Sequence, residues 1–344
     1  MNWRFRLALP SSSLLAVTAL AALSACAGST PGVPLSTAQG MSGSHSQAFA
    51  EPATSNTWTM GAPAPTRQFT GAAAAVGTNI YLVGGENHTA VLNENDVYNT
   101  LTNTWSKAKR MPTKRATLAA AAVNGLVYAI GGSTFTGTPL TTVEAYNPVS
   151  DTWSTKAPLP TAVDSTSATV DNGLIYVVGG FVNGNGTPFN GVETYNPATN
   201  AWTSVAPLNV AKSFSFIATV GSEIVAAAGS VGTGPTTDNE VYDPTSNAWT
   251  NKRSAHLARY GGCMGSIGGS LYAAGGLKFV PFRSAAKELY AYNVAADRWT
   301  KLARLPSPMI APASATMNGQ LYCIGGSPRF GQPTFSQKVQ IYQP

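Results

Sequence analysis

The chain has 344 residues, of which only 10% are charged, and it contains 34 glycines and 23 prolines. A low charged fraction with many turn-forming residues is typical of an all-β protein. The formal net charge is +6, but the positive residues are spread along the chain. This excludes a nucleic-acid-binding function, which needs a dense basic stripe.

Residues 1–25 have the pattern of a secretory signal peptide. A basic start with Arg4 and Arg6 precedes an apolar run that ends in the motif LSAC at Cys26. The run is too short to remain as a membrane-spanning helix. The motif resembles the bacterial lipobox, which implies cleavage before Cys26 and lipidation of its thiol. The alternative is an ordinary signal peptide in which Cys26 is incidental.

Residues 26–55 are rich in Ser, Gly, Ala, Thr and Pro and show no apolar period, so they are expected to form a flexible tether. Ala27, in place of Asp, resembles the pattern of lipoproteins sent to the outer membrane. We therefore expect a protein of the bacterial cell envelope, held by its lipid anchor alone, on the periplasmic or the surface side of the outer membrane.

The remainder of the chain is an internal repeat. Each repeat has a tryptophan, a glycine pair whose second member lies 27 positions later, and a tyrosine that precedes the next tryptophan by seven positions. The tryptophans are Trp58, Trp105, Trp153, Trp202, Trp249 and Trp299. The second glycines are Gly85, Gly132, Gly180, Gly229, Gly276 and Gly326, and in the fourth pair Ala228 replaces the first glycine.

Each repeat divides into four short strands, which we call a, b, c and d. In the second repeat they read TLAAAAV, LVYAIGG, TVEAYNP and TWSTKA, with an Asn-Gly hairpin turn between a and b. Four such strands every 47–50 residues indicate a β-propeller blade. The glycine pair, tyrosine and tryptophan resemble the kelch repeat over residues 56–344. The region starts with a strand d and ends with a strand c, so we expect a six-bladed ring in which the N-terminal strand completes the last blade.

All length variation between repeats lies in the b–c loops, after the glycine pairs. We expect the glycines to relieve crowding near the axis, and the face that carries these loops to be the functional one. The loops contain aromatic and basic residues that are typical of a binding surface. These candidates are Phe135, Phe181, Phe279, Arg283 and Arg329. The alternative is that the phenylalanines pack beneath their own loops.

A second candidate set lies 17 positions before the second glycine, where the chain enters strand a. It comprises Arg115, Lys212 and Arg259, with Arg67 next to the same position in its repeat. Because strand a is innermost, we expect these residues to line the channel mouth. The kelch resemblance implies that arginines placed here bind acidic ligands, such as a carboxylate or an acidic sugar. The alternative is solvated charge paired with Glu94 or Asp164.

Two further groups are expected to be structural. Glutamates recur before the tyrosines at Glu144, Glu193, Glu240 and Glu288, and a feature that repeats in several blades indicates a blade-stabilising role. Cys263 and Cys323 fall on differently placed strands of different blades. A disulfide between them is an alternative, but we expect two buried free thiols.

The sequence lacks the motifs of the common hydrolases and zinc sites, so we expect no cofactor and no metal. The expected function is that of a monomeric binding module for a protein or glycan ligand that can be acidic. The alternative is a mutarotase or epimerase acting on an acidic sugar such as N-acetylneuraminate, an activity known in some periplasmic kelch propellers, with Glu86, His88 and His256 as candidate acid–base groups. A purely structural envelope protein is a third reading.

Overall fold

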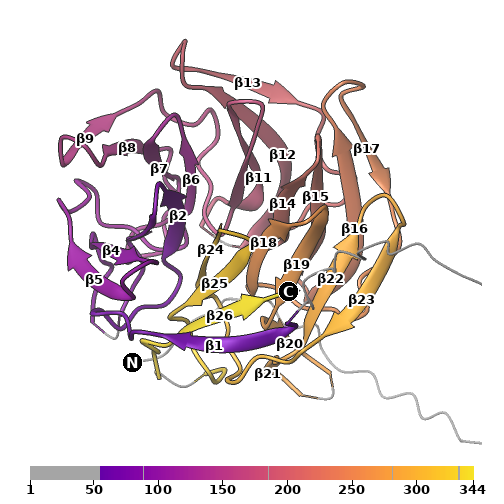
Figure 1. Ribbon diagram of the computed structural model, residues 1–344. Coiled ribbons are helices and arrows are strands. Elements are labelled where there is room, and N and C mark those ends of the chain that lie inside the picture. Colours follow the sequence, from indigo (N-terminus) through magenta and orange to yellow (C-terminus); the bar gives the residue numbers. More distant parts are fainter. Residues whose placement is uncertain (1–54, 88, 185, 281, 332–333) are drawn as a thin grey trace, which may run out of the picture. The chain divides into compact units, whose positions relative to one another are not determined.

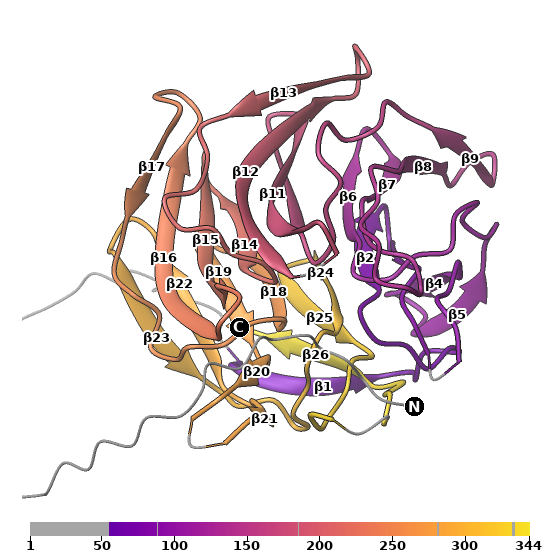
Figure 2. The same ribbon diagram turned by 180° about the vertical axis from the view of Figure 1, so that it is seen from behind.

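The computed structural model describes residues 55–344 except 88, 185, 281 and 332–333. The signal peptide, the tether and Cys26 lie outside the described residues. The described residues form six four-stranded antiparallel sheets arranged as the blades of a propeller around one axis (Figures 1 and 2). The expected all-β, six-bladed architecture is confirmed. Within this part of the chain, no helix is long and apolar enough to cross a membrane.

The strands occupy the four radial positions that the repeat predicts. Strands a are β2 (Ala72–Val76), β6 (Ala119–Val123), β10 (Ser167–Asp171), β14 (Phe216–Val220), β18 (Cys263–Ile267) and β24 (Ala313–Met317). Strands b are β3 (Asn79–Val83), β7 (Leu126–Ile130), β11 (Leu174–Val182), β15 (Glu223–Ser230), β19 (Ser270–Ala274) and β25 (Gln320–Ile324).

Strands c are β4 (Asn95–Asn99), β8 (Val143–Asn147), β12 (Thr187–Asn196), β16 (Pro235–Asp243), β22 (Leu289–Asn293) and β26 (Val339–Gln343). The outer strands d are β5 (Thr104–Lys107), β9 (Thr152–Thr155), β13 (Ala201–Val205), β17 (Ala248–Asn251), β23 (Arg298–Leu302) and β1 (Thr57–Gly61). Blades 1 to 6 are numbered from β2. A small hairpin, β20 (Leu277–Lys278) with β21 (Ser284–Ala285), lies in the b–c loop of blade 5.

The ring closes between the two ends of the propeller. Strand β1 pairs with β26 along five positions, from Thr57 opposite Gln343 to Gly61 opposite Val339. In Figure 1 the indigo β1 lies beside the yellow β26. The N-terminal strand thus supplies strand d of blade 6, as the sequence predicts. The outer edge of β26 is covered, so it cannot pair with another chain.

The repeated tyrosine and tryptophan join each blade to the preceding one. In blade 2, the Tyr146 hydroxyl donates to Asp151 at 2.7 Å, and the same carboxylate accepts the backbone N–H of Lys109, which follows the outer strand of blade 1. The indole of Trp153 donates to the Lys109 carbonyl. Equivalent contacts occur in all six blades. These residues recur because they satisfy backbone groups between blades.

The glycine pairs also make contacts between blades. The N–H of Gly132 donates to the Val163 carbonyl of the next blade at 2.9 Å, and Gly131 has a φ of 59°. A Cβ on Gly131 would lie 2.7 Å from that same carbonyl oxygen. The first glycine is therefore needed for close approach to the neighbouring blade. A Cβ on Gly132 would lie 2.6 Å from the Ala116 carbonyl oxygen and 2.9 Å from Leu118 Cβ, so the second glycine relieves crowding against the innermost strand of its own blade. In blade 4, Ala228 adopts the left-handed conformation with a φ of 52°.

Strand b does not always end at the glycines. In blades 3 and 4, β11 and β15 continue past them through a bulge, between Val178 and Gly180 and between Ala227 and Gly229. The expectation that the glycines end the strand is wrong for these two blades. Two adjacent residues with positive φ form a bulge here, and the chain beyond it pairs again with strand c, as Gly229 does with Thr236.

Cys263 and Cys323 form a disulfide, with their Cα atoms 5.6 Å apart. The expectation of two free thiols is wrong. Cys263 begins strand a of blade 5 and Cys323 lies in strand b of blade 6. Neighbouring blades pack so that strand a of one faces strand b of the next. Two cysteines at different radial positions in adjacent blades can therefore form a disulfide. Both residues are fully buried.

Candidate functional site

A channel of about 380 Å³ runs along the axis of the propeller. Its walls are the six strands a, whose sequences are mainly Ala, Ser, Thr and Gly, as in AAAAV of β2 and β6. Small side chains are required because six strands converge here. The mouth of the channel on the b–c face is the candidate site.

The mouth is framed by a ring of six residues, one from each blade, that lie 15 positions before the second glycine. Each has a positive φ, between 46° and 60°. Each N–H donates to the carbonyl of its counterpart in the preceding blade, at 2.6–3.1 Å, so the six hydrogen bonds close a circle. We call these residues the mouth ring; they are Thr70, Thr117, Ser165, Phe214, Gly261 and Ala311.

The mouth ring is polar on the side of blades 1 to 3. There each ring hydroxyl contacts another polar side chain at the start of a loop or strand. The Thr70 hydroxyl lies 3.4 Å from a Glu86 carboxylate oxygen, and the Ser165 hydroxyl donates to Asp164 at 2.6 Å. Between them, the hydroxyls of Thr117 and Ser133 are 2.9 Å apart. We call these six side chains the polar half of the mouth.

Two carboxyl groups of the polar half have perturbed acidity. Burial raises the pKa of Asp164 to about 6, although the hydrogen bond from Ser165 opposes this change. Burial also raises the pKa of Glu86, and the Thr70 hydroxyl offsets part of the effect. Neither carboxyl forms an ion pair with a described residue. Neither carboxyl lines the channel itself, but each contacts a mouth-ring hydroxyl that does. A carboxylate without a basic partner in such a place is a candidate for ligand contact or acid–base chemistry.

The mouth is aromatic on the side of blades 3 to 5. The Phe214 ring lies 5.9 Å from Tyr260, which in turn lies 6.1 Å from Phe279, and Phe181 stands edge-on to Phe214 at 6.1 Å. Such spacings are normal for aromatic pairs. These four rings form the aromatic half of the mouth. Phe181 and Phe279, two of the predicted loop phenylalanines, are thus brought together beside the channel, both half-buried.

The other predicted loop residues surround this aromatic half or lie apart from it. The Arg283 guanidinium stacks over Phe279 at 4.4 Å and over Phe330 at 5.6 Å. Arg329 is exposed in the neighbouring loop of blade 6. Phe135 is 64% exposed at the tip of the blade 2 loop and is not part of the aromatic half.

The predicted positive funnel at the channel mouth does not exist, because three of its four members are buried inside blades. Arg115 and Lys212 are fully buried and Arg259 is 3% exposed. Arg115 forms an ion pair with Glu144 at 2.7 Å. Arg67, the fourth member, is exposed. Residues that lie 17 positions before the second glycine point away from the axis, beneath strand b. The mouth-ring residues, two positions further along the chain, face the channel.

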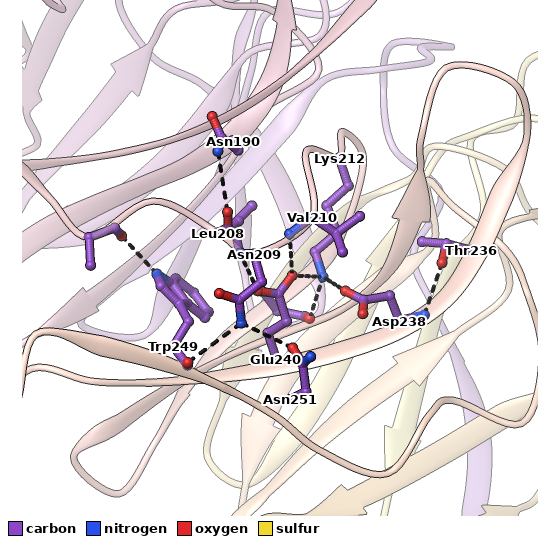
Figure 3. Close-up of polar contacts among 12 residues, drawn as sticks. Asn190, Leu208, Asn209, Val210, Lys212, Thr236, Asp238, Glu240, Trp249 and Asn251 are labelled. Atoms are coloured by element: carbon purple, nitrogen blue, oxygen red, sulfur yellow. Dashed lines mark hydrogen bonds and ion pairs between the residues drawn. The ribbon is translucent and has the colours of Figure 1, made fainter.

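Lys212 shows how such a buried charge is satisfied (Figure 3). Its ammonium group pairs with Asp238 and Glu240 and donates to the Ala226 carbonyl at 3.1 Å. Glu240 also accepts the backbone N–H groups of Asn209 and Val210 from the chain that enters the blade. The network anchors the d–a connection to strand c, and it leaves this lysine unable to contact a ligand.

Arg259 is satisfied without a carboxylate. Its guanidinium donates to the backbone carbonyls of Ala273, Gly275 and Glu288 at 2.7–2.9 Å, and it lies 5.0 Å from the Phe216 ring centroid. Burial lowers the pKa of Arg259 to about 10, so the group is still charged at neutral pH. The alternative pairing of these basic residues with Glu94 or Asp164 is also wrong, since Glu94 pairs with Lys107 and Arg110.

The glutamates before the tyrosines have the expected structural contacts. Glu144 and Glu240 hold the buried cations, and Glu193 accepts a hydrogen bond from Ser204 at 2.8 Å. Glu288 lies two residues earlier in its repeat than the others and pairs with Lys278 and Arg304. In blade 5, Tyr290 occupies the repeat position that glutamate has in blades 2 to 4, and its ring lies beside Arg259.

The two histidine candidates lie differently. His256 is exposed and stacks on Tyr290 at 5.5 Å. His88 lies outside the described residues. Among the residues that are described, no group of three or more His, Cys, Asp or Glu side chains could hold a metal ion.

Sequence reasoning missed the mouth ring and gave Asp164 only the role of an ion-pair partner. A signal was present, because the ring position holds Thr, Thr and Ser in three successive blades. The left-handed conformation and the facing direction could not be read from residue types, since Phe214 and Ala311 are unusual at positive φ.

The geometry can be compared with known proteins at this point. The Kelch motif model matches residues 71–112, 114–160, 165–209, 213–254 and 258–306, which together exceed half of the chain. The chain belongs to the kelch family. The matched ranges begin near strand a and end after strand d of blades 1 to 5, so the family model and the structure divide the kelch repeats in the same way.

A solved structure titled "Structure of YjhT" resembles this kelch propeller. It superposes with a TM-score of 0.71 at 17% sequence identity and covers 80% of this chain and 95% of its own. An identity this low shows a shared fold and nothing about the ligand. No protein with a curated description matches the chain.

Proposed function

We propose that this kelch propeller is a binding module whose ligand is a carbohydrate held at the channel mouth on the b–c face. The observation that carries the proposal is the division of the mouth into a polar half and an aromatic half. A sugar ring presents hydroxyl groups at its edge and apolar C–H groups on its faces. Hydroxyl and carboxyl groups can bind the edge while aromatic rings contact a face.

The loops around the mouth extend this surface in the proposal. Arg283 and Arg329, with Phe279 between strands β20 and β21, would contact more distant parts of a larger glycan. A protein ligand is the second form of the same proposal. It is favoured by Val280 and Phe282, each 78% exposed in the blade 5 loop, because exposed apolar groups of this kind are common in interfaces.

A glycan-array and titration screen on the purified protein tests the proposal. A Phe214→Ala variant is expected to weaken binding at least tenfold, because it removes the aromatic wall nearest the channel. The matched control is Val149→Ala, which truncates an apolar residue that is 97% exposed in a c–d turn. Unchanged affinity in Phe214→Ala, or equal losses in both variants, would contradict the assignment of the mouth.

A second candidate function is catalysis of sugar mutarotation. It is favoured by Asp164, whose pKa of about 6 suits a group that exchanges a proton at neutral pH. Mutarotation requires one group to protonate the ring oxygen while another removes the proton of the anomeric hydroxyl. The test is NMR measurement of anomer equilibration with N-acetylneuraminate and with neutral hexoses. The absence of any acceleration by the protein would rule out this function.

We also propose that the protein is a monomer of the bacterial envelope, anchored at Cys26 to the outer membrane. The support is the lipobox-like LSAC motif followed by a polar tether. Labelling of cells with radioactive palmitate should mark the native protein and leave Cys26→Ser unlabelled. Equal labelling of both proteins would contradict the anchor.

A further inference from the structure

We infer that the channel mouth selects cationic, hydroxyl-bearing ligands such as amino sugars and discriminates against acidic ones. This inference rests on the proposed carbohydrate-binding function and specifies the charge class of the ligand. It reverses the sequence-based expectation of an acidic ligand. The argument depends on where the charged groups of the b–c face lie.

The polar half supplies hydrogen-bond acceptors at its two edges. Glu86 is half-buried and Asp164 is 9% exposed, and each contacts a hydroxyl of the mouth ring through one carboxylate oxygen. No described residue donates a hydrogen bond to the second oxygen of either group. A ligand with N–H or O–H groups can donate hydrogen bonds to the second oxygens of both carboxylates, whereas a ligand carboxylate can only repel them.

No ion pair joins a described basic residue to Glu86 or Asp164, although Arg67 and Arg329 are exposed on the same face. The three cations that enter the inner ends of the blades are bonded beneath strand b, as shown above for Arg115, Lys212 and Arg259. Arg283 is exposed, but its guanidinium stacks on the aromatic half, over Phe279 and Phe330. Among the described residues, the polar half therefore keeps two carboxyl groups without a counter-ion, and it attracts positive charge.

The aromatic half favours the same kind of ligand. Phe214 lines the channel, and Tyr260 and Phe279 extend the aromatic half outward. The faces of such rings attract an ammonium group and also contact the C–H face of a sugar. An amino sugar satisfies both halves, because its ammonium and hydroxyl groups donate while its ring remains apolar on one face.

Isothermal titration at pH 7.5 with three trisaccharides of matched size tests the inference on the intact protein. The probes are tri-glucosamine, tri-N-acetylglucosamine and tri-galacturonate, which are cationic, neutral and acidic. We expect tri-glucosamine to bind at least tenfold more tightly than the neutral probe, and tri-galacturonate to bind most weakly. Raising the salt concentration should reduce the difference, since it depends on charge.

The double variant Glu86→Gln, Asp164→Asn should remove the preference for tri-glucosamine and retain binding of the neutral probe. The matched control is Glu94→Gln, a carboxylate on the same loop that already pairs with Lys107 and Arg110 and should keep the preference. If the double variant does not fold, the two single variants provide the same comparison, each with a partial loss.

The inference is overturned if tri-galacturonate binds as tightly as tri-glucosamine, or if the preference survives in the carboxyl variants. In those cases the proposed function still stands, provided that Phe214→Ala weakens all three probes. The absence of binding by every probe would overturn both the inference and the proposed carbohydrate site.

Discussion

Arg115, Lys212 and Arg259 occupy one repeated position, and each donates to the equivalent backbone carbonyl of strand b, but their other partners differ. Arg115 adds one carboxylate, Lys212 adds two carboxylates, and Arg259 adds two further carbonyls and two aromatic rings. Burial lowers the pKa of Arg115, and the nearby Glu144 carboxylate opposes this change. At the residue scale, the position in the repeat determines how deeply a side chain is buried. The neighbouring residues in strand c determine which type of side chain can be buried there.

Asp164 leads to a pH-dependent prediction. Its pKa is about 6 in the folded protein and 3.8 in the unfolded chain, so the folded state binds the proton more strongly. Stability from this group is therefore greatest below pH 4 and is lost as the pH rises toward 6. Asp164→Asn, which imitates the protonated form, should stabilise the protein at pH 8 by up to about 3 kcal/mol.

Urea denaturation of the native protein and of Asp164→Asn at pH 4 and pH 8 measures this effect. The two proteins should have nearly equal free energies of unfolding at pH 4 and should separate at pH 8. Asp243→Asn is the control, because hydrogen bonds lower the pKa of that exposed carboxyl and the sign of its pH dependence is opposite. A constant difference between native protein and Asp164→Asn at both pH values would contradict the assignment.

At the scale of single elements, the glycine pairs set the distance between blades. In the five pairs that begin with glycine, the first glycine has a positive φ and faces a backbone carbonyl of the next blade, and the N–H of the second donates to the same carbonyl. Gly179 has the closest such contact, since a Cβ there would lie 2.3 Å from the Lys212 carbonyl oxygen. A rigid backbone atom cannot move aside as a side chain can.

Gly179→Ala should therefore cost at least about 2 kcal/mol more than Gly173→Ala. Both glycines have positive φ, of 60° and 79°, so both variants include the cost of the left-handed backbone. Gly173 lies in an a–b turn, and a Cβ there would meet nothing within 4 Å. Thermal or urea unfolding of the two variants isolates the clash between blades, and equal destabilisation would show that the interblade contact is not close.

The strands and their order could be predicted from the sequence because the spacings of Trp, Tyr and Gly are set by backbone hydrogen bonds that repeat in every blade. The bulges at Gly180 and Gly229 and the β20–β21 hairpin could not, since they depend on pairing across loops of different length. For the candidate site, the sequence predicts the face that is proposed here but not the residues of the mouth. Choosing Thr117 rather than Arg115 requires knowing which of two residues, two positions apart, turns toward the channel, and that direction follows from the positive φ of Thr117.

At the scale of the whole molecule, the disulfide joins blade 5 to blade 6, the blade that closes the ring. It encloses a segment of 60 residues, for which restriction of the unfolded chain predicts a contribution of about 4 kcal/mol. The double variant Cys263→Ala, Cys323→Ala should lose that amount in urea denaturation under oxidising conditions.

Addition of a reductant is the control for this prediction. It should lower the stability of the native protein toward that of the double variant and leave the variant unchanged. If the variant and the oxidised native protein unfold at the same urea concentration, the bond does not stabilise the propeller. Ligand affinity at the mouth is expected to persist in the variant, because neither cysteine belongs to the polar or the aromatic half.

The pairing of β1 with β26 has a consequence for the order of events during synthesis. Thr57 is among the first propeller residues to leave the ribosome, and its partner Gln343 is among the last. At roughly 5–20 residues per second, β1 waits between about a quarter of a minute and a minute before its partner exists. During that time the nascent chain can form up to five complete blades, and the incomplete ring has an unpaired strand edge at each of its two ends. The cell must therefore keep β1 unpaired, and protected from other chains, until β26 has been synthesised.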